Sequence, residues 1–263
     1  MDSIRPFREL HSGGSFVMPN PWDIGSAVVL EQLGFVALAT TSSGLALANG
    51  QLDGAIGLEQ LAEHVRQIHG AISVPINVDA ERLFSEDLGG LAASVETLVD
   101  AGAAGVSIED YSRERDGIDE VEIAARRVGA AVEAASASGV VVTARAENLI
   151  RGVNDIADTL ERLRAYRDAG ADVLYAPGLV DPDDIAAAVA IGPPLNVLAR
   201  PTTPPIAELA SLGVRRVSIG GSFALAAYAA LVDAANEVLE HGTSTYQLAS
   251  PNFGTATRLL ADR

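Results

Sequence analysis

The sequence of 263 residues contains no cysteine, and all 18 of its basic residues are arginine, so lysine is absent as well. Without cysteine the chain has no thiolate nucleophile, no disulfide and no zinc–thiolate site. Without lysine it cannot form the Schiff base on which one class of aldolases and the pyridoxal enzymes depend. Only 5% of the residues are aromatic while 48% are hydrophobic, which predicts a core of Ala, Val, Leu and Ile.

Positive charge is scarce, because 18 basic residues face 35 acidic ones and the formal net charge is −17. A field of this sign repels phosphate backbones and anionic lipids, so neither nucleic acid nor a membrane is expected as a partner. The N-terminus has no apolar signal region, and no apolar run approaches the roughly 20 residues of a membrane span. We expect a cytoplasmic protein that acts on a small molecule.

What the sequence does contain is an alternation of short apolar runs and amphipathic stretches, which is typical of parallel βα units. Eight runs begin at Phe16, Phe35, Val74, Gly105, Val140, Asp172, Leu195 and Arg215. Helices are predicted to end at glycines 34, 102, 170 and 213. The pattern predicts one (β/α)8 TIM barrel domain over residues 1–263, with an N-terminal segment to about residue 14 and a C-terminal helical extension from about residue 241. A doubly wound open sheet is the alternative.

Polar residues collect where the predicted strands end, which is the active-site face of such a barrel. They are Asn77, Asp79, Glu81, Glu109, Arg145 and Glu147. Carboxylates that converge on one mouth repel one another unless a cation neutralises them, which favours a metal site over the alternative of helix caps and solvent-facing acids. The site would hold Mg²⁺ or Mn²⁺ on oxygen ligands, since none of the four histidines falls at a strand end.

Three further features point to anion binding. The fork of Arg145 suits a substrate carboxylate, although it could instead be the counter-ion of Glu147 or Glu109. The run TTSSGL at residues 40–45 predicts a hydroxyl-rich turn that offers hydrogen-bond donors, with an ordinary Ser/Thr turn as the alternative. The run IGGS at residues 219–222 is more typical of a tight turn than of a phosphate site.

In the order and spacing of five segments and of the acidic third strand, the chain resembles the isocitrate lyase/phosphoenolpyruvate mutase superfamily. The segments are PNPWDIGSA, LGFVALATTSSGLA, SIED, TARAENLIRG and YRDAGADVL. The resemblance implies a Mg²⁺-dependent barrel, a dimer or more usually a tetramer that exchanges C-terminal helices, acting on a small 2-oxo carboxylic acid. It also implies a substrate-binding set and a metal set. The first is Thr41, Ser43, Gly44, Leu45, Asn77 and Arg145, and the second is Asp53, Asp79 and Glu109.

The chain departs from the superfamily at three places. The usual D-x-D-x-G is Asn77-Val78-Asp79-Ala80-Glu81, so an amide stands where a metal ligand is expected. The lyase loop K-K-C-G-H is replaced by DYSRERDGIDE, and a histidine of the mutases is replaced near Ala176 and Pro177. We expect a carbon–carbon lyase or decarboxylase of a small 2-oxo or 2-hydroxy diacid. Carbon–phosphorus chemistry and a noncatalytic acid-binding barrel are the alternatives.

The expected reaction stabilises a pyruvate enolate, with the metal on the 2-oxo group and Arg145 on the carboxylate. The proton donor would be Tyr111, Tyr175 or water, with Tyr111 on the loop after the fourth strand. The predicted catalytic residues are therefore Arg145, Tyr111 and Glu147.

Overall fold

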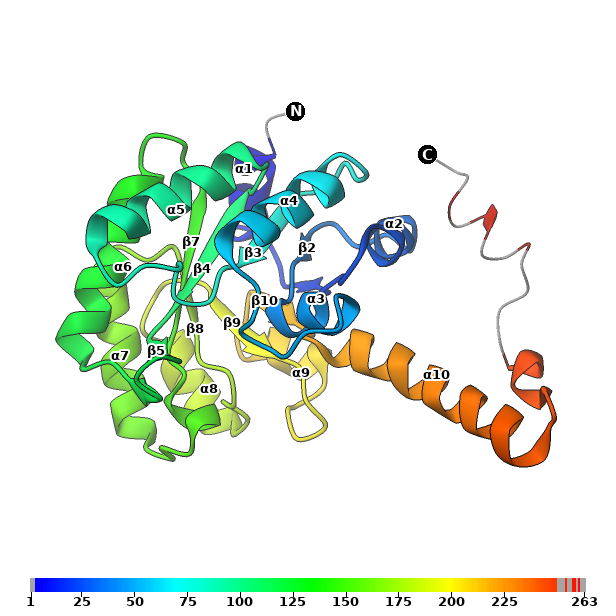
Figure 1. Cartoon of the computed structure of the whole chain (residues 1–263). Coiled ribbons are helices and arrows are strands. Elements are labelled where there is room, and N and C mark those ends of the chain that lie inside the picture. Colours follow the sequence, from blue (N-terminus) through cyan, green and yellow to red (C-terminus); the bar gives the residue numbers. More distant parts are fainter. Residues whose placement is uncertain (1–2, 250–253, 255–256, 259, 261–263) are drawn as a thin grey trace.

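Eight parallel strands form the wall of a nearly closed barrel, and each of the eight apolar runs contains one of them (Figure 1). The strands are β1 (Phe16–Met18), β2 (Leu38–Ala39), β3 (Ile76–Asp79), β4 (Gly105–Glu109), β7 (Val141–Arg145), β8 (Val173–Tyr175), β9 (Leu195–Leu198) and β10 (Arg216–Ser218). Strands β2, β3, β4, β7, β8, β9 and β10 pair in chain order, and β1 pairs with β10. Between β1 and β2 a single backbone bond, from Ala39 N to Pro19 O at 3.0 Å, continues the wall. The predicted barrel is confirmed.

A computed structural model of the chain describes residues 3–249 and residues 254, 257, 258 and 260. Helices surround the strands. They are α1 (Ile4–Leu10), α2 (Ile24–Gln32), α3 (Ser42–Ala48), α4 (Leu58–His69), α5 (Leu88–Asp100), α6 (Val121–Ala135), α7 (Ile156–Asp168), α8 (Pro182–Val189), α9 (Ile206–Ser211) and α10 (Ser222–His241). A hairpin of β5 (Tyr111–Ser112) and β6 (Gly117–Ile118) follows β4, and short 3₁₀ turns occupy η1 (Asn148–Arg151) and η2 (Thr245–Leu248).

Glycine lies in the left-handed region at all four predicted helix ends, with φ between 94° and 106°. At Gly102 a side chain is excluded twice, because φ is 106° and an added Cβ would lie 2.4 Å from the ring of His69. These residues turn each helix back toward its next strand, which confirms the predicted punctuation.

The interior of the barrel is closed at its amino-terminal end by α1. Phe7 of α1 has no exposed surface, and an added Cβ on Gly105 would lie 2.6 Å from its ring. His11 follows α1 and stacks edge-on against Phe7 and Phe16, with ring centroids 4.8 and 5.2 Å away. This plug leaves the carboxyl ends of the strands as the open end.

Helix α10 projects from the barrel, and Ala224 is its buried residue (Figure 1). Its exposed apolar side chains include Leu225, Leu231 and Leu239. By length and composition alone it is the one helix among the described residues that could cross a membrane, with a mean hydropathy of 1.3, although Asp233, Glu237 and Glu240 interrupt its apolar run. The predicted extension from residue 241 contains η2, and residues 250–253, 255–256, 259 and 261–263 lie outside the described residues.

Candidate active site

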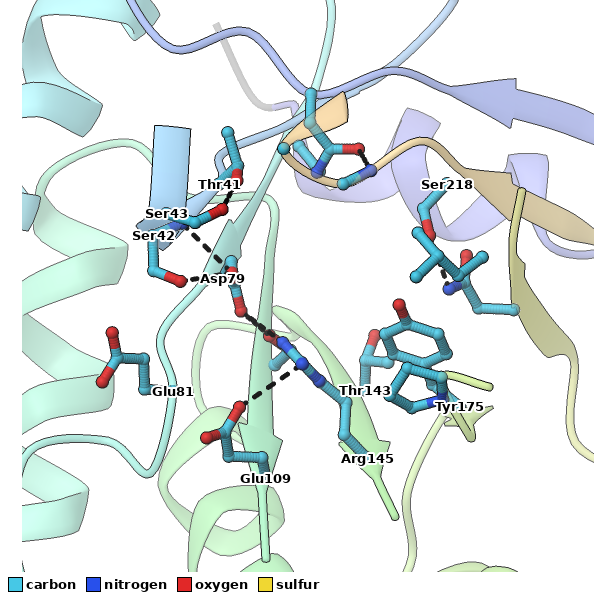
Figure 2. A pocket seen from close by; sticks show the side chains of 18 of the residues that line it. Thr41, Ser42, Ser43, Asp79, Glu81, Glu109, Thr143, Arg145, Tyr175 and Ser218 are labelled. Carbon is cyan, nitrogen blue, oxygen red and sulfur yellow. Dashed lines mark hydrogen bonds and ion pairs between the residues drawn. The ribbon is translucent and has the colours of Figure 1, made fainter. Parts of the chain in front are cut away.

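A cavity of about 210 Å³ opens at the carboxyl ends of the strands, where the sequence predicts the site (Figure 2). Eight of the predicted site residues line it. They are Thr41, Ser43, Asp53, Asn77, Asp79, Glu109, Arg145 and Glu147. Seven of them lie on or shortly after β2, β3, β4 and β7, while Asp53 lies in the loop between α3 and α4, so four neighbouring strands and this loop bring them together.

Arg145, the last residue of β7, lies among three carboxylates. Its Nη1 donates to Asp79 Oδ1 at 2.6 Å, and its Nη2 and Nε donate to Glu147 Oε1 at 2.6 and 3.1 Å. Glu109 Oε2 lies 3.4 Å from Nη2. Burial lowers the pKa of Arg145, but the carboxylates outweigh it and raise that pKa well above its ordinary value. The guanidinium group is therefore charged and held in one orientation.

Asp79 ties this arginine to the start of α3. Its Oδ2 accepts hydrogen bonds from the backbone N and the Oγ of Ser42, at 3.2 and 3.1 Å. The predicted turn at residues 40–45 is wrong, because the chain begins a helix at Ser42, where Thr41 is the N-cap and accepts from Gly44 N at 3.3 Å. A hydroxyl at the N-cap satisfies an amide that would otherwise have no partner in the first turn. The hydroxyls of Thr41 and Ser43 lie 3.1 Å apart at the cavity wall.

Two glutamates beside Arg145 are held away from water. Glu109 is 6% exposed, and burial raises its pKa well above the ordinary value, against the influence of Arg145. Glu81 follows β3 with φ of 46°, a conformation that is uncommon for residues other than glycine. Burial, and then the charge of Asp79, raise the pKa of Glu81 to about 7. The raised pKa values show that the carboxylates of the mouth lie close enough together to disfavour one another's ionised form.

The rim carries three further ion pairs, two of them made by Arg113. Arg113 Nη2 donates to Asp53 Oδ2 at 2.9 Å, and its Nε lies 3.7 Å from Glu81 Oε2. Arg151 Nη2 lies 3.4 Å from Glu147 Oε2. Both arginines are more exposed than Arg145, so these pairs are weaker than those at the centre of the mouth.

Three predicted residues do not line the cavity. Gly44 and Leu45 are buried in α3, where an added Cβ on Gly44 would lie 2.5 Å from Thr41 Cγ2. Tyr111 belongs to β5, and its hydroxyl donates to Asp116 Oδ1 at 2.6 Å. Tyr175, at the end of β8, does line the cavity, and its ring centre is 5.2 Å from the guanidinium carbon of Arg145.

The other wall of the cavity, from β8, β9, β10 and β1, contains residues that the sequence did not single out. They include Met18, Asn20, Asn196, Arg216 and Ser218. Asn20 Oδ1 accepts from the backbone N of Ile219 and of Gly220, at 3.0 and 2.8 Å, so these amides of the IGGS run have a partner within the protein. Reading β10 with the two-residue period of a strand would have put Arg216 on the same face as Ser218.

The donor chemistry of the mouth fits a hard divalent cation. Asn77 Oδ1 and Glu81 Oε1 are buried without a hydrogen-bond partner, and the charged donors are carboxylates. Within the part of the chain that the structure describes, no three His, Asp or Glu side chains already form a metal cage, since Asp79 and Asp53 pair with arginines. Metal ligation would therefore need Asp79 to leave Arg145. The four histidines lie in or beside helices, at His11, His64, His69 and His241.

Comparison with known proteins gives consistent results. The sequence profile of the family described as phosphoenolpyruvate phosphomutase matches residues 7–239. An uncharacterized protein of Mycobacterium tuberculosis is 35% identical over 217 residues, which is 81% of each chain. A crystal structure from Burkholderia cenocepacia, assigned as a lyase or mutase, superposes with a TM-score of 0.94 at 42% identity, covering 98% of this chain and 96% of that one. A structure of 2,3-dimethylmalate lyase, a member of the PEP mutase/isocitrate lyase superfamily, has a TM-score of 0.86 at 26% identity and covers 99% and 95%.

Proposed function

Because the chain belongs to the phosphoenolpyruvate phosphomutase family, within a superfamily that includes carbon–carbon lyases, we propose that it cleaves a carbon–carbon bond in a small 2-oxo or 2-hydroxy diacid. The observation that carries this proposal is a buried arginine held among carboxylates at the mouth of the barrel. A guanidinium group in that position can exchange a protein carboxylate for a substrate carboxylate without losing its charge partner. The 2,3-dimethylmalate lyase is named for a 2-hydroxy diacid, which supports the substrate class.

In the proposed reaction, Arg145 and the hydroxyl of Ser43 hold the carboxylate next to the 2-oxo group. Asp79 then separates from Arg145, and Asp79, Glu109 and Asp53 would hold Mg²⁺ or Mn²⁺, with Asn77 and Glu81 beside them. When bound, the metal supplies a Lewis acid. In a 2-oxo diacid the bond between C3 and the C4 carboxylate breaks, CO2 leaves, the electron pair passes into the C2–C3 enolate, and a proton added at C3 completes the product. In a 2-hydroxy diacid the 2-hydroxyl gives up its proton, C2 becomes the carbonyl of a 2-oxo acid as the C2–C3 bond breaks, and a proton completes the other fragment at C3.

The proton donor is proposed to be Tyr175 or a water molecule. Burial raises the pKa of Tyr175 to about 12, so its hydroxyl is protonated at neutral pH and can donate. Tyr111 is the alternative, and it would first have to release Asp116. Buried Glu147 holds Arg145 in place and is proposed as a positioning residue.

The test is to incubate the protein and Mg²⁺ with oxaloacetate, 2-methylisocitrate, 2,3-dimethylmalate and phosphonopyruvate, and to follow pyruvate formation. Turnover of one carbon acid is expected, with loss in Asp79→Ala and Arg145→Ala. Turnover of phosphonopyruvate instead would support carbon–phosphorus chemistry, the alternative that the family match favours. Binding of these acids without turnover would show a noncatalytic barrel. Turnover that survives both substitutions would refute the assigned site.

The apolar surface of α10 supports a proposal about assembly. Its side chains Leu225, Leu231 and Leu239 are 61–82% exposed, and we propose that a second copy of the chain covers them in a dimer or tetramer, with exchange of the C-terminal helices. We also propose that the protein is cytoplasmic, with neither a membrane nor nucleic acid as partner. Light scattering should show that Leu231→Glu dissociates the oligomer, while Leu88→Glu, at an exposed leucine that begins α5 on the other side of the barrel from α10 (Figure 1), does not.

A further inference from the structure

Arg216 is a cation enclosed in the barrel with neutral partners. It begins β10 and is 2% exposed. Its Nε donates to Asn196 Oδ1 and its Nη2 donates to Thr143 Oγ1, both at 2.9 Å. Its Nη1 lies 3.4 Å from His11 Nε2. Each partner offers a dipole and none offers a full charge.

No carboxylate among the described residues lies within ion-pair distance of Arg216. His11 cannot supply a charge either, because burial, and then Arg216, lower the pKa of His11 to about 4, so the ring is neutral at pH 7. Its Nδ1 lies 2.8 Å from Phe7 O and donates to it, which leaves Nε2 as an acceptor for Arg216. Burial lowers the pKa of Arg216 to about 9, which leaves it charged at neutral pH. A buried charge without a counter-charge is costly, and a bound anion would offset that cost.

Arg216 lies in the wall of the same cavity as Arg145. In the strand register Arg145 is opposite Tyr175, Tyr175 is opposite Asn196, and Asn196 is opposite Arg216. This is one continuous row across four strands.

The hydrogen bond from Arg216 to Thr143 fixes the depth of its guanidinium group. Thr143 precedes Arg145 by two residues on β7, a rise of roughly 6.6 Å along a strand. Arg216 therefore reaches β7 about one side-chain layer below Arg145, with Tyr175 lining the cavity that both arginines share. A short dicarboxylic acid that lies along the barrel axis also places its two carboxylates at different depths.

We propose that Arg216 binds the second carboxylate of a small dicarboxylic acid whose first carboxylate is held by Arg145. The inference rests on the proposed function for the first carboxylate and adds the floor of the cavity as an anion site. The two arginines differ in their surroundings, because Arg145 has three protein carboxylates around it, whereas Arg216 has none among the residues that the structure describes. A purely structural role, tying β10 to β7, is the competing explanation.

The test uses matched pairs of acids that differ by one carboxylate: lactate against malate, and pyruvate against oxaloacetate. Affinities are measured by calorimetry on the full chain with Mg²⁺, for wild type and Arg216→Met. Wild type should bind malate about tenfold or more tightly than lactate, since a hydrogen bond to a charged group contributes on that scale. Arg216→Met should remove this preference and leave lactate affinity within about twofold. Thr143→Val, which keeps the cation but removes the hydrogen bond that sets its depth, should reduce the preference by less than Arg216→Met does.

The other possible results distinguish the anion site from a structural role of Arg216 and from a failure of the proposed function. Equal binding of malate and lactate by wild type, or an equal loss of both in Arg216→Met, overturns the inference in favour of a structural role. If Arg216→Met does not fold, Arg216→Lys decides, since a shorter side chain should weaken malate and spare lactate. An Arg216-dependent preference without turnover of any acid would refute the proposed function and keep the anion site. Turnover of oxaloacetate without an Arg216-dependent preference would support the proposed function and refute the anion site.

Discussion

The two halves of the barrel mouth differ in charge. On the side of β2, β3, β4 and β7, the cavity is lined by five carboxylates, with Arg113, Arg145 and Arg151 among them. On the side of β8, β9, β10 and β1, the lining is uncharged except for Arg216. Figure 2 shows the contrast, with Asp79, Glu81 and Glu109 around Arg145 and with Tyr175 and Ser218 on the opposite side.

This difference separates two tasks. The charged half holds more carboxylates than arginines, so it has negative charge available for a divalent cation. The neutral half has little to offer a metal, but its single buried cation favours an anionic group. A substrate that spans the cavity would meet the metal and Arg145 on one side and Arg216 on the other.

The largest effect is expected for Arg145→Ala, which removes the central positive charge from the charged half. Three carboxylates lose their shared cation, and breaking a buried pair costs about 3–5 kcal/mol of stability. With substrate, kcat/KM should fall about 10³-fold. Urea unfolding and steady-state rates measure both. Arg151→Ala, at the rim, is the control and should cost about 1 kcal/mol or less. Equal effects of the two substitutions would contradict the assigned centre.

His11→Gln tests the neutral half through pH. The pKa of His11 is lowered from 6.5 to about 4 in the folded state. Between pH 4 and 6.5 the unfolded chain binds more protons than the folded one. The stabilisation from keeping His11 neutral is therefore fully present above pH 6.5, and roughly 3 kcal/mol of it is lost as the pH falls to 4. Arg216, Arg8 and Asp172 are the charged groups that act on this ring.

Urea midpoints of wild type and His11→Gln between pH 4 and 7 give the His11 contribution by difference, because carboxyl groups that titrate in this window are common to both proteins. The variant should lose less stability on the acid side. His241→Gln, at an exposed histidine, should follow wild type. Parallel curves for all three proteins would show that the ring is not held neutral.

Mg²⁺ binding should also distinguish the charged half of the mouth from the neutral half, through a smaller change in the free energy of unfolding. Mg²⁺ at about 100 times its Kd should stabilise wild type by roughly 2.7 kcal/mol, and EDTA should reverse the shift. Asp79→Asn should abolish the shift, while Ser218→Ala, on the neutral half, should keep it. Calorimetric Tm values with and without Mg²⁺ provide the measurement. A shift that is lost in Ser218→Ala and kept in Asp79→Asn would place the metal on the wrong side.

The smallest effect is expected at the rim. Arg113 and Asp53 form a pair whose side chains are 36% and 50% exposed, so Arg113→Ala should cost about 1 kcal/mol or less. That cost should nearly vanish in 1 M salt, where charges at the surface are screened within about 3 Å. Thermal unfolding at low and high salt measures it. A cost that salt does not change would mean that the pair is better shielded from solvent than its exposure indicates.

Sequence reasoning located the charged half, but in the neutral half it named only Tyr175 and the IGGS run and passed over Arg216. Asp79, Glu109 and Arg145 stand at the ends of apolar runs, where parallel strands must converge, so their position in the chain was sufficient. Arg216 stands at the start of its run, and the cavity reaches it because the barrel is hollow below the mouth. The turn predicted at residues 40–45 failed for a local reason, since Thr41 caps a helix as readily as it initiates a turn.

The sequence by itself determined the barrel, because the period of its apolar runs and the glycines at its helix ends allow few other arrangements of parallel strands. It also determined that thiol and Schiff-base chemistry are absent, since that follows from residue types alone. Only the tertiary structure decided which charges are neutralised. Arg145 meets three carboxylates and Arg216 meets none among the described residues, and this follows from distances and burial across strands that are far apart in the chain.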